Sequence, residues 1–420
     1  MKNGRIYNYN KTIMEKFMRK FAIFFTALIL MMSILCSISV SAAEYVKTKD
    51  DVFAVSRGGD TTDFPQNSLE AITACLDLKI DGISATAKLT QDGKVVLFES
   101  DSTKDICVDK NGKIVDKKIS ETDYKTLSSF YLLSSSDINT AHKTNSKIAL
   151  LSDALKTADK KMILIIDCDN AVIDKAYDVA AESGYLDYVV FRCRDMKKDD
   201  LLNWASSKTE KPEIIASYKG NVIFSAISTY NFAEENNLFA CEFTTKNLYG
   251  VIYNSVFTSR FEKAKVIAPV YNSNLAGKRP DSVKGWEDLL SRGYNIIETA
   301  NAREFSSYIT LMEENRLSLE RIYNESAKVD LSQFTDSSTK EFSKHMKIAE
   351  EIIKGKKVAS SSEISECIEN IRLSTSEFEK KIGNDESAFS VTPMKIFWIA
   401  FALALFAASQ IYIFRKTKKS

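Results

Sequence analysis

The chain has 420 residues, of which 45% are hydrophobic and 27% charged, and its formal net charge is +1. Residues 1–42 and 394–420 each carry a net +5, so the segment between them carries −9. This negative charge argues against nonspecific binding of nucleic acid or of anionic surfaces, because both need basic side chains. The roughly 350 residues between the ends exceed one ordinary domain and fit a large barrel with a small added module.

The amino-terminal end predicts a secretory signal over residues 1–42. Lys16, Arg19 and Lys20 precede an uncharged stretch at 21–40, and small residues then favour cleavage after Ala42. An uncleaved signal anchor is the alternative, because twenty uncharged residues can also span a bilayer. Both interpretations place the middle of the chain outside the cytoplasm.

From residue 51 to about 308, short apolar runs alternate with helical patterns. The runs predict buried strands at 52–55, 95–98, 162–166, 188–191, 265–270 and 295–297, and amphipathic stretches predict helices at 68–78, 199–206 and 282–291. The alternation predicts an α/β fold with a (β/α)8 TIM barrel over residues 45–309. An open doubly wound sheet is the alternative, but no glycine-rich phosphate fingerprint follows the first strand.

Residues 107–120 form a polar insertion with Asn111-Gly112 at its centre, which favours a hairpin turn. In a barrel the insertion would follow the third strand and overhang the carboxyl-terminal mouth. Cysteines at 75, 107, 168, 193, 241 and 367 show no CxxC pair, so we expect buried thiols rather than disulfides. The histidines, His142 and His345, neighbour no cysteine cluster and predict no zinc site.

The carboxyl-terminal part predicts helices and a membrane anchor. Apolar residues at helical spacing predict a bundle of two or three helices over 311–383, with one helix capped by Ser361. A polar linker at 384–395 precedes the uncharged run 396–414, which would span about 28 Å as a transmembrane helix. The basic tail 415–420 is expected in the cytoplasm, so the protein is predicted to be single-pass with its ectodomain outside. A buried core helix at 396–414 is the alternative.

Several motifs follow one another at regular spacing. They are Ser56-Arg57-Gly58-Gly59, Pro65-Gln66-Asn67-Ser68, the run DGISATAKLTQDGKVVLFES at 81–100, Ile165-Ile166-Asp167-Cys168-Asp169, and the run GYNIIET at 293–299. Together they resemble the glycerophosphodiester phosphodiesterase family over residues 50–309. The resemblance implies a TIM barrel whose mouth binds a phosphodiester.

The resemblance also implies that the usual proton-transfer groups are missing. The family uses two histidines as general acid and base, and these positions hold Ser56 and Glu99. Serine cannot shuttle protons near neutral pH, whereas histidine can. Arg57 remains at the family's phosphate-binding position, where a guanidinium suits phosphate. A purely structural ion pair is the alternative role for Arg57.

The family's metal positions hold Ser84, Thr86 and Asp167, so two carboxylates have become hydroxyls. This lowers the ligand charge from about −3 to about −1 and should weaken divalent-metal binding severely. Asp169 replaces the family's lysine. We therefore expect no cofactor, unless Glu99, Asp167 and Asp169 form a rebuilt Ca²⁺ or Mg²⁺ site, with Asp101 and Glu298 as further possible ligands. The alternative places these acids on solvated loop ends.

The helical segment resembles a FIVAR module, a three-helix unit of Gram-positive surface proteins. The similarity lies in residues 323–327, Phe334-Thr335, 349–353 and 361–373. It implies a spacer or a contact with a glycan or matrix protein. Three functions therefore stay open: an inactive barrel that binds a glycerophospho-group or a protein, an active hydrolase with a rebuilt site, and an adhesin acting through the helices.

Overall fold

The computed structural model describes residues 52–135, 140–244, 250, 253–259, 266–269 and 281–380. The expected signal, linker, transmembrane segment and cytoplasmic tail lie outside these residues. Within the described part, no helix combines the length and apolar character that a bilayer crossing requires.

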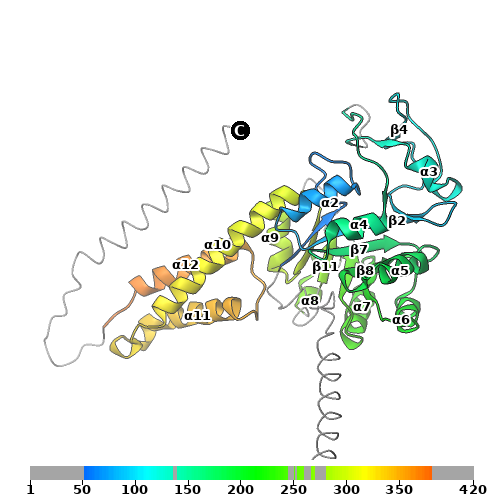
Figure 1. Cartoon of the computed structure of the whole chain (residues 1–420). Helices are drawn as coiled ribbons and strands as arrows, with labels where there is room; N and C mark the ends of the chain where they lie inside the picture. Colours follow the sequence, from blue (N-terminus) through cyan, green and yellow to red (C-terminus); the bar gives the residue numbers. More distant parts are fainter. Residues whose placement is uncertain are drawn as a thin grey trace, which may run out of the picture.

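Eight parallel strands pair in a closed ring in the described chain (Figure 1). They are β1 (Phe53–Arg57), β2 (Gly82–Leu89), β7 (Ile163–Cys168), β8 (Val189–Cys193), β9 (Glu213–Lys219), β10 (Ala240–Thr244), β11 (Val266–Pro269) and β12 (Ile296–Thr299). Strand β1 pairs with both β12 and β2, which closes the ring. The predicted TIM barrel is confirmed, and the open doubly wound sheet is wrong.

A helix follows each barrel strand and covers its outer face. These helices are α2 (Leu69–Leu76), α4 (Leu151–Ala158), α5 (Ile173–Glu182), α6 (Lys198–Ser206), α7 (Ile223–Glu235), α8 (Ser255–Thr258), α9 (Val283–Ser291) and α10 (Ala302–Ser326), and a short 3-10 turn, η3 (Leu186–Tyr188), precedes β8. The predicted helices at 68–78, 199–206 and 282–291 are confirmed as α2, α6 and α9. Ser68 caps α2 by accepting a hydrogen bond from the Ala71 amide at 3.1 Å.

The inward-facing residues of the strands change in character along the barrel axis. Side chains alternate across a strand, so Ile163, Ile165 and Asp167 of β7 all face the interior. The lower interior is an apolar cluster that includes Phe53, Val55, Ile163, Ile165, Val190, Ile215 and Ile296. Toward the carboxyl ends of the strands the inward positions become polar and charged, and this end forms the mouth.

The segment between β2 and α4 forms a small lobe of its own above the mouth. Its elements are β3 (Val95–Leu97), β4 (Cys107–Val108), η2 (Ile119–Glu121), α3 (Tyr124–Leu127), β5 (Tyr131–Leu132) and β6 (Ala149–Leu150). We call this whole lobe, which contains the polar stretch 107–120, the insertion. The hairpin turn at Gly112 is confirmed, with φ of +80°. The buried strand predicted at 95–98 is confirmed as β3, but it pairs antiparallel with the end of β2 and so lies outside the ring, not as the third barrel strand.

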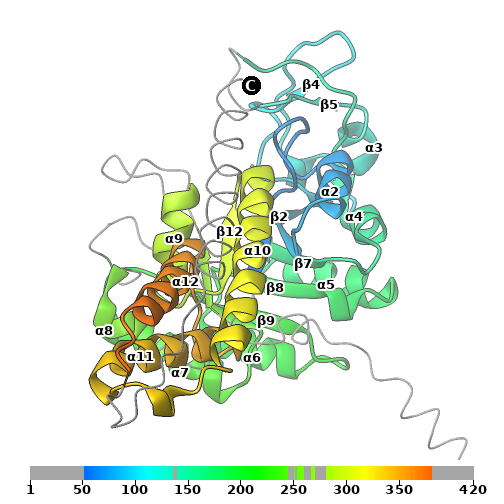
Figure 2. The same ribbon diagram turned by 90° about the vertical axis from the view of Figure 1, so that its left-hand side faces the viewer.

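Helix α10 is both the last barrel helix and the first helix of a three-helix unit. It packs with α11 (Asp336–Ile353) and α12 (Ser361–Ser376), and η5 (Leu331–Gln333) lies between α10 and α11 (Figure 2). The helix expected near 361 begins there, but its cap is Ser360 rather than Ser361. Ser360 and Glu363 form a reciprocal capping box, and Ser361 is instead buried against Tyr308.

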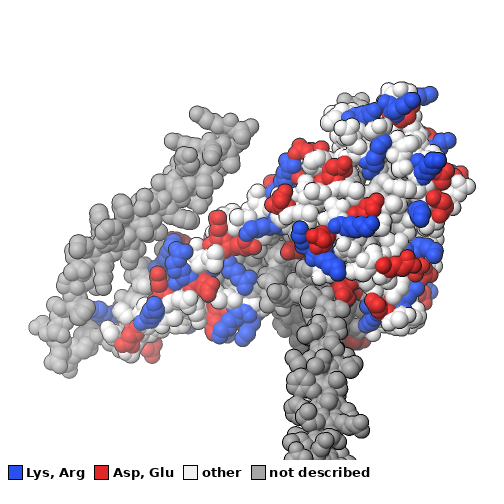
Figure 3. Space-filling model, viewed as in Figure 1, with Lys and Arg blue, Asp and Glu red and all other residues white. Residues whose placement is uncertain are grey.

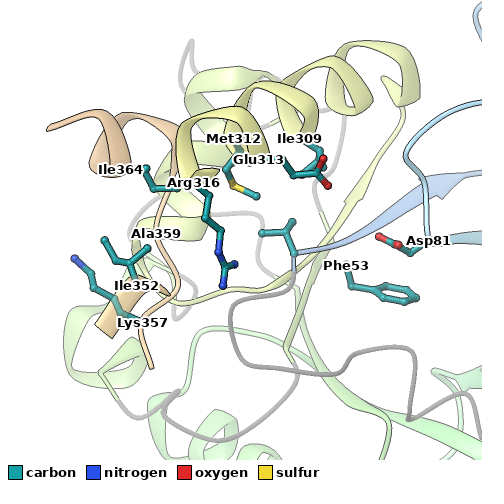
Figure 4. Close-up of a pocket in the computed structure, with 11 residues that line it drawn as sticks. Phe53, Asp81, Ile309, Met312, Glu313, Arg316, Ile352, Lys357, Ala359 and Ile364 are labelled. Atoms are coloured by element: carbon teal, nitrogen blue, oxygen red, sulfur yellow. The ribbon is translucent and has the colours of Figure 1, made fainter. Parts of the chain in front are cut away.

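A cavity of about 230 Å³ lies where the helical unit meets the base of the barrel (Figure 4). Phe53 at the start of β1 lines it from the barrel, and Met312 and Arg316 line it from α10. The helical unit therefore contacts the base, at the end opposite the mouth. Acidic and basic side chains are interspersed over the face drawn in Figure 3.

All six cysteines of the described chain are buried and carry reduced thiols. This agrees with the prediction of buried thiols rather than a disulfide framework.

Candidate functional site

The centre of the mouth is a buried cluster of opposite charges. Arg192 of β8 is 3% exposed, and its Nη1 lies 2.6 Å from Oε2 of Glu298 on β12. The same guanidinium lies 3.9 Å from Glu242 of β10 and 3.4 Å from Asp167 of β7. One arginine thus contacts carboxylates from three other strands. Its Nε is buried without a hydrogen-bond partner in the described chain.

Arg194, just beyond β8, adds a second cation to this cluster. Its guanidinium contacts Asp167 through Nη1 and lies 2.8 Å from Oε1 of Glu242 through Nη2. Ser217 of β9 also donates a hydrogen bond to Glu242 at 2.8 Å. We call Asp167, Arg192, Arg194, Glu242 and Glu298 the central charge cluster. It contains three carboxylates and two guanidiniums.

Burial and charge act in opposite directions on the carboxylates of the central charge cluster. Burial opposes ionisation of Glu242, but Arg192 and Arg194 hold the pKa of Glu242 below its ordinary value of 4.5. For Asp167, burial prevails over the two arginines and raises the pKa above its ordinary value, and Glu242 and Glu298 add to the rise. Burial would lower the pKa of Arg192, yet its carboxylate neighbours raise it well above the usual range.

Ser56, at the first family histidine position, does not face the barrel interior. It is fully buried, and its hydroxyl donates to the Gly59 carbonyl at 2.7 Å. It also contacts the Cys75 thiol of α2. Ser84, at a family metal position, is 3% exposed at the level where β1 and β2 pair. Neither serine has the chemistry of the family residue at its position.

Arg57, Thr86 and Glu99 lie together at the mouth, as the resemblance implied. The Thr86 hydroxyl donates to Oε2 of Glu99 at 2.9 Å, and Nη2 of Arg57 lies 4.0 Å from Oε1 of Glu99. Gln66 donates to the same carboxylate at 3.4 Å. The Arg57 side chain is 33% exposed, and its contact with Glu99 is long for an ion pair. Arg57 also interacts electrostatically with the buried carboxylate of Asp281.

Asp169 and Asp101 lie away from this group. The expectation that Asp169 shares a strand face with Asp167 is wrong, because β7 ends at Cys168. Asp169 instead accepts hydrogen bonds from the amides of Ala171 and Val172, both at 3.1 Å, in the turn that leads into α5. Asp101 is paired with Lys88 on the surface at 2.6 Å.

The described residues do not fit a divalent cation. Ca²⁺ and Mg²⁺ need several anionic oxygens that converge on one point. Glu99, Asp167 and Asp169 bond to separate partners, and no group of three or more His, Cys, Asp or Glu side chains in the described chain is arranged to hold a metal. Where carboxylates do converge, in the central charge cluster, guanidinium groups lie between them.

The loop after β1 is held in one conformation that presents Arg57. Gly58 and Gly59 have φ of +75° and +91°, and a Cβ on Gly59 would lie 2.6 Å from the carbonyl carbon of Ala71. Buried Asp60 accepts a hydrogen bond from Arg303 of α10 at 2.6 Å. The two glycines allow this close approach to α2, which only a residue without a side chain permits.

A cavity of about 640 Å³ opens at the mouth between the β1–α2 loop and the insertion. Arg57, Thr61 and Gln66 line it from the barrel, and Ser134 and His142 line it from the insertion. The sequence interpretation did not include Ser134 and His142 in the site. The only feature of the sequence that could have drawn attention to this pair is that His142 is one of two histidines in the chain.

The sequence interpretation also missed Arg192, Arg194 and Glu242. The sequence did contain an indication of this cluster, because Arg192 and Glu242 each follow apolar residues in a strand. A charged residue in a buried strand needs a partner of opposite charge. The partners come from strands that are distant in the sequence.

No protein-family model matches the chain, and no curated protein matches it in sequence. Among solved structures, it is similar to a glycerophosphoryl diester phosphodiesterase from Parabacteroides distasonis ATCC 8503. The two share 19% identity over 64% of this chain and 90% of the other, with a TM-score of 0.51. A proposed glycerophosphoryl diester phosphodiesterase from Silicibacter pomeroyi DSS-3 shares 12% identity over 66% and 98%, with a TM-score of 0.50.

In fold, the chain is a (β/α)8 barrel of the kind found in these phosphodiesterases. This agrees with the resemblance of residues 50–309 to that family. The chain therefore has the fold of these phosphodiesterases, with an insertion above the mouth and a helical unit at the base.

Proposed function

We propose that the protein binds a glycerophosphodiester at the mouth of the barrel and does not hydrolyse it. The observation that carries the proposal is the central charge cluster, in which Arg192 and Arg194 form ion pairs with Asp167, Glu242 and Glu298. Carboxylates engaged by guanidiniums are not free to hold a metal ion that would activate water. Arg57, exposed at the rim, supplies the cationic contact for the phosphate.

The replacement of the family's two proton-transfer histidines supports the same proposal. Hydrolysis of a phosphodiester needs groups placed to move protons to and from the reacting oxygens. The hydroxyl of Ser56 is buried against Gly59, and Glu99 is engaged by Thr86 and Gln66. Binding and orientation of the phosphate remain possible with Arg57, while turnover by the family's acid–base pair does not.

We further propose that the protein acts at the outer face of the cell membrane. The support is the sequence pattern alone: a secretory signal at 1–42, an apolar run at 396–414 and a basic tail. A Gram-positive surface location rests on the FIVAR resemblance of the helical unit. Attachment of a cell-surface glycan or protein to that unit is the competing proposal for the site of binding.

The test uses the full-length chain in a mild detergent with glycerophosphoglycerol and glycerophosphocholine. Calorimetry gives the dissociation constants, and a coupled assay measures released glycerol 3-phosphate with Mg²⁺, Ca²⁺ or a chelator. We expect binding of at least one ligand without release, and Arg57→Gln should weaken it at least about tenfold. The matched control is Arg372→Gln, which removes an exposed arginine of α12.

Two outcomes would overturn the proposal. Metal-dependent release that Asp167→Ala abolishes would establish the rebuilt carboxylate site and an active hydrolase. Failure of both ligands to bind, in a protein with a cooperative melting transition, would reject the mouth as a glycerophosphodiester site and leave the helical unit as the binding part.

A further inference from the structure

Ser134 and His142 form a tightly held pair on the insertion side of the mouth cavity. The Ser134 Oγ lies 3.0 Å from Nδ1 of His142, and the His142 amide donates to the same oxygen at 3.1 Å. The Ser134 amide donates to the His142 carbonyl at 2.9 Å. The neighbouring residues Leu133 and Lys143 form an antiparallel bridge. His142 is therefore held by hydrogen bonds to its backbone and to its imidazole ring.

The tautomer of the His142 ring decides what its outer nitrogen, Nε2, offers to a ligand. In the tautomer in which Ser134 donates to Nδ1, the hydrogen of the neutral ring is on Nε2. In the imidazolium form Nε2 also carries a hydrogen. Within the described chain Nε2 makes no hydrogen bond, and His142 lines the cavity together with Arg57. A ring nitrogen that can donate a hydrogen bond, or accept one in the other tautomer, thus faces the same space as a guanidinium.

The remaining lining of the cavity is hydroxyl-rich. Thr61, Thr62, Ser134, Ser135 and Thr140 each bring a hydroxyl, and Gln66 brings an amide, while the described lining contains no Phe, Tyr or Trp side chain. The one lining carboxylate, Asp63, is paired with Arg303. Such a wall suits a ligand that carries several hydroxyls. Among the described lining residues there is none of the Trp, Tyr or Phe rings over which a quaternary ammonium group binds.

We propose that His142, held by Ser134, is a specificity residue that binds the second polyol arm of a polyol phosphodiester, the arm that glycerophosphocholine lacks, while Arg57 holds the phosphate. This inference rests on the proposed function and names its ligand class. A cavity of about 640 Å³ is within the range that small-molecule sites occupy. Ligands with two polyol arms, such as glycerophosphoglycerol, then bind more tightly than those with one polyol arm and a quaternary amine.

The experiment compares dissociation constants of glycerophosphoglycerol and glycerophosphocholine for the full-length chain. We expect wild type to bind glycerophosphoglycerol at least about fivefold more tightly. His142→Ala should weaken glycerophosphoglycerol about tenfold and leave glycerophosphocholine within about twofold, so the preference disappears. Ser134→Ala should produce a smaller loss in the same direction, because the ring remains but is less firmly held.

The matched control is His345→Ala, which removes the other histidine of the chain. It lies on α11 in the helical unit, and its loss should leave both constants unchanged. Melting temperatures show whether each variant folds. If His142→Ala does not fold, Ser134→Ala provides the test instead.

The outcomes separate the two proposals. If wild type binds both ligands equally, or if His142→Ala weakens both to the same degree, the polyol arm is not read by His142 and this inference fails while the binding function stands. If wild type binds neither ligand, the proposed function itself fails. Metal-independent release of glycerol 3-phosphate that His142→Ala abolishes would make His142 a catalytic residue and overturn both proposals.

Discussion

Arg192 and Glu298 face each other across the interior of the barrel, with Nη1 and Oε2 2.6 Å apart. The two residues are 106 positions apart in the chain and both are buried. The guanidinium of Arg192 therefore lies among three carboxylates, the groups that would otherwise be ligands for a divalent metal ion. The following predictions test what this arrangement and its surroundings do.

Replacing Arg192 by Met should destabilise the protein severely. The change leaves Glu242 and Glu298 buried with only Arg194 nearby, and breaking a buried ion pair typically costs about 3–5 kcal/mol. Urea unfolding followed by circular dichroism measures the loss. Glu298→Gln added to Arg192→Met should recover part of it, because one unpaired charge is removed.

The control for this prediction is Lys118→Met, which breaks an exposed ion pair with Glu121. Surface pairs contribute about 0–1 kcal/mol, so little change is expected. Equal effects of Arg192→Met and Lys118→Met would show that the central charge cluster does not support the fold.

Stability should fall in acid because of Glu242. Its folded pKa lies below the ordinary 4.5, so it contributes stability that is present above about pH 4.5 and is lost as the pH falls through the folded pKa. Asp167 has a raised folded pKa and acts in the opposite direction, since its neutral form is favoured in the folded state. Urea unfolding at pH values from about 6 to 3 measures the net slope.

Glu242→Gln serves as the test variant for the acid effect. It should be less stable than wild type near pH 6 and should lose less stability between pH 6 and 3. A slope identical to that of wild type would assign the acid sensitivity to other carboxylates, such as Asp60, whose pKa is also lowered.

Gly59→Ala should disturb the loop that presents Arg57. A Cβ at this position would lie 2.6 Å from the Ala71 carbonyl carbon, with φ at +91°. Overpacking and positive φ each cost about 1–3 kcal/mol, so both stability and ligand affinity should fall. Gly93→Ala is the matched control, since its φ is +73° but nothing lies within 4 Å of its Cβ. Comparable losses in the two variants would mean that backbone strain alone, and not contact with α2, explains the effect.

The buried thiols should be inert in the folded protein. Burial raises the pKa of Cys75 to about 11 and that of Cys107 to about 12. At pH 8 only about 0.1% or less of either is thiolate, and the thiolate is the reactive form. Iodoacetamide followed by peptide mass spectrometry should label both only after denaturant is added. An exposed cysteine introduced as Glu320→Cys should react at once, and rapid native labelling of Cys75 would show that α2 opens from the barrel.

The barrel itself was predictable because its strands are short apolar runs. β7 and β12 fall where the runs at 162–166 and 295–297 predicted them. β9 and β10 were not predicted, since Ser217, Tyr218 and Glu242 interrupt their apolar pattern. Ser217 and Glu242 have hydrogen-bond and ion-pair partners on or beside other strands, and spacing along one strand does not contain that information.

The candidate site was predictable only where family motifs preserved it. Arg57, Thr86 and Glu99 lie together as the resemblance implied. Asp169 was misplaced because the strand ends one residue earlier, at Cys168. His142 comes from the insertion, and its position opposite Arg57 depends on how the insertion folds over the mouth.

Helix α10 has a mechanical consequence. Its 25 residues, at about 1.5 Å each, form a strut about 37 Å long that begins beside the mouth and continues into the helical unit. Because one unbroken helix belongs to both parts, a pull or twist on the helical unit reaches Arg303 and its partner Asp60 without passing through a loop. The barrel and the helical unit thus share one continuous helix, so the orientation of one part relative to the other is set by α10 itself.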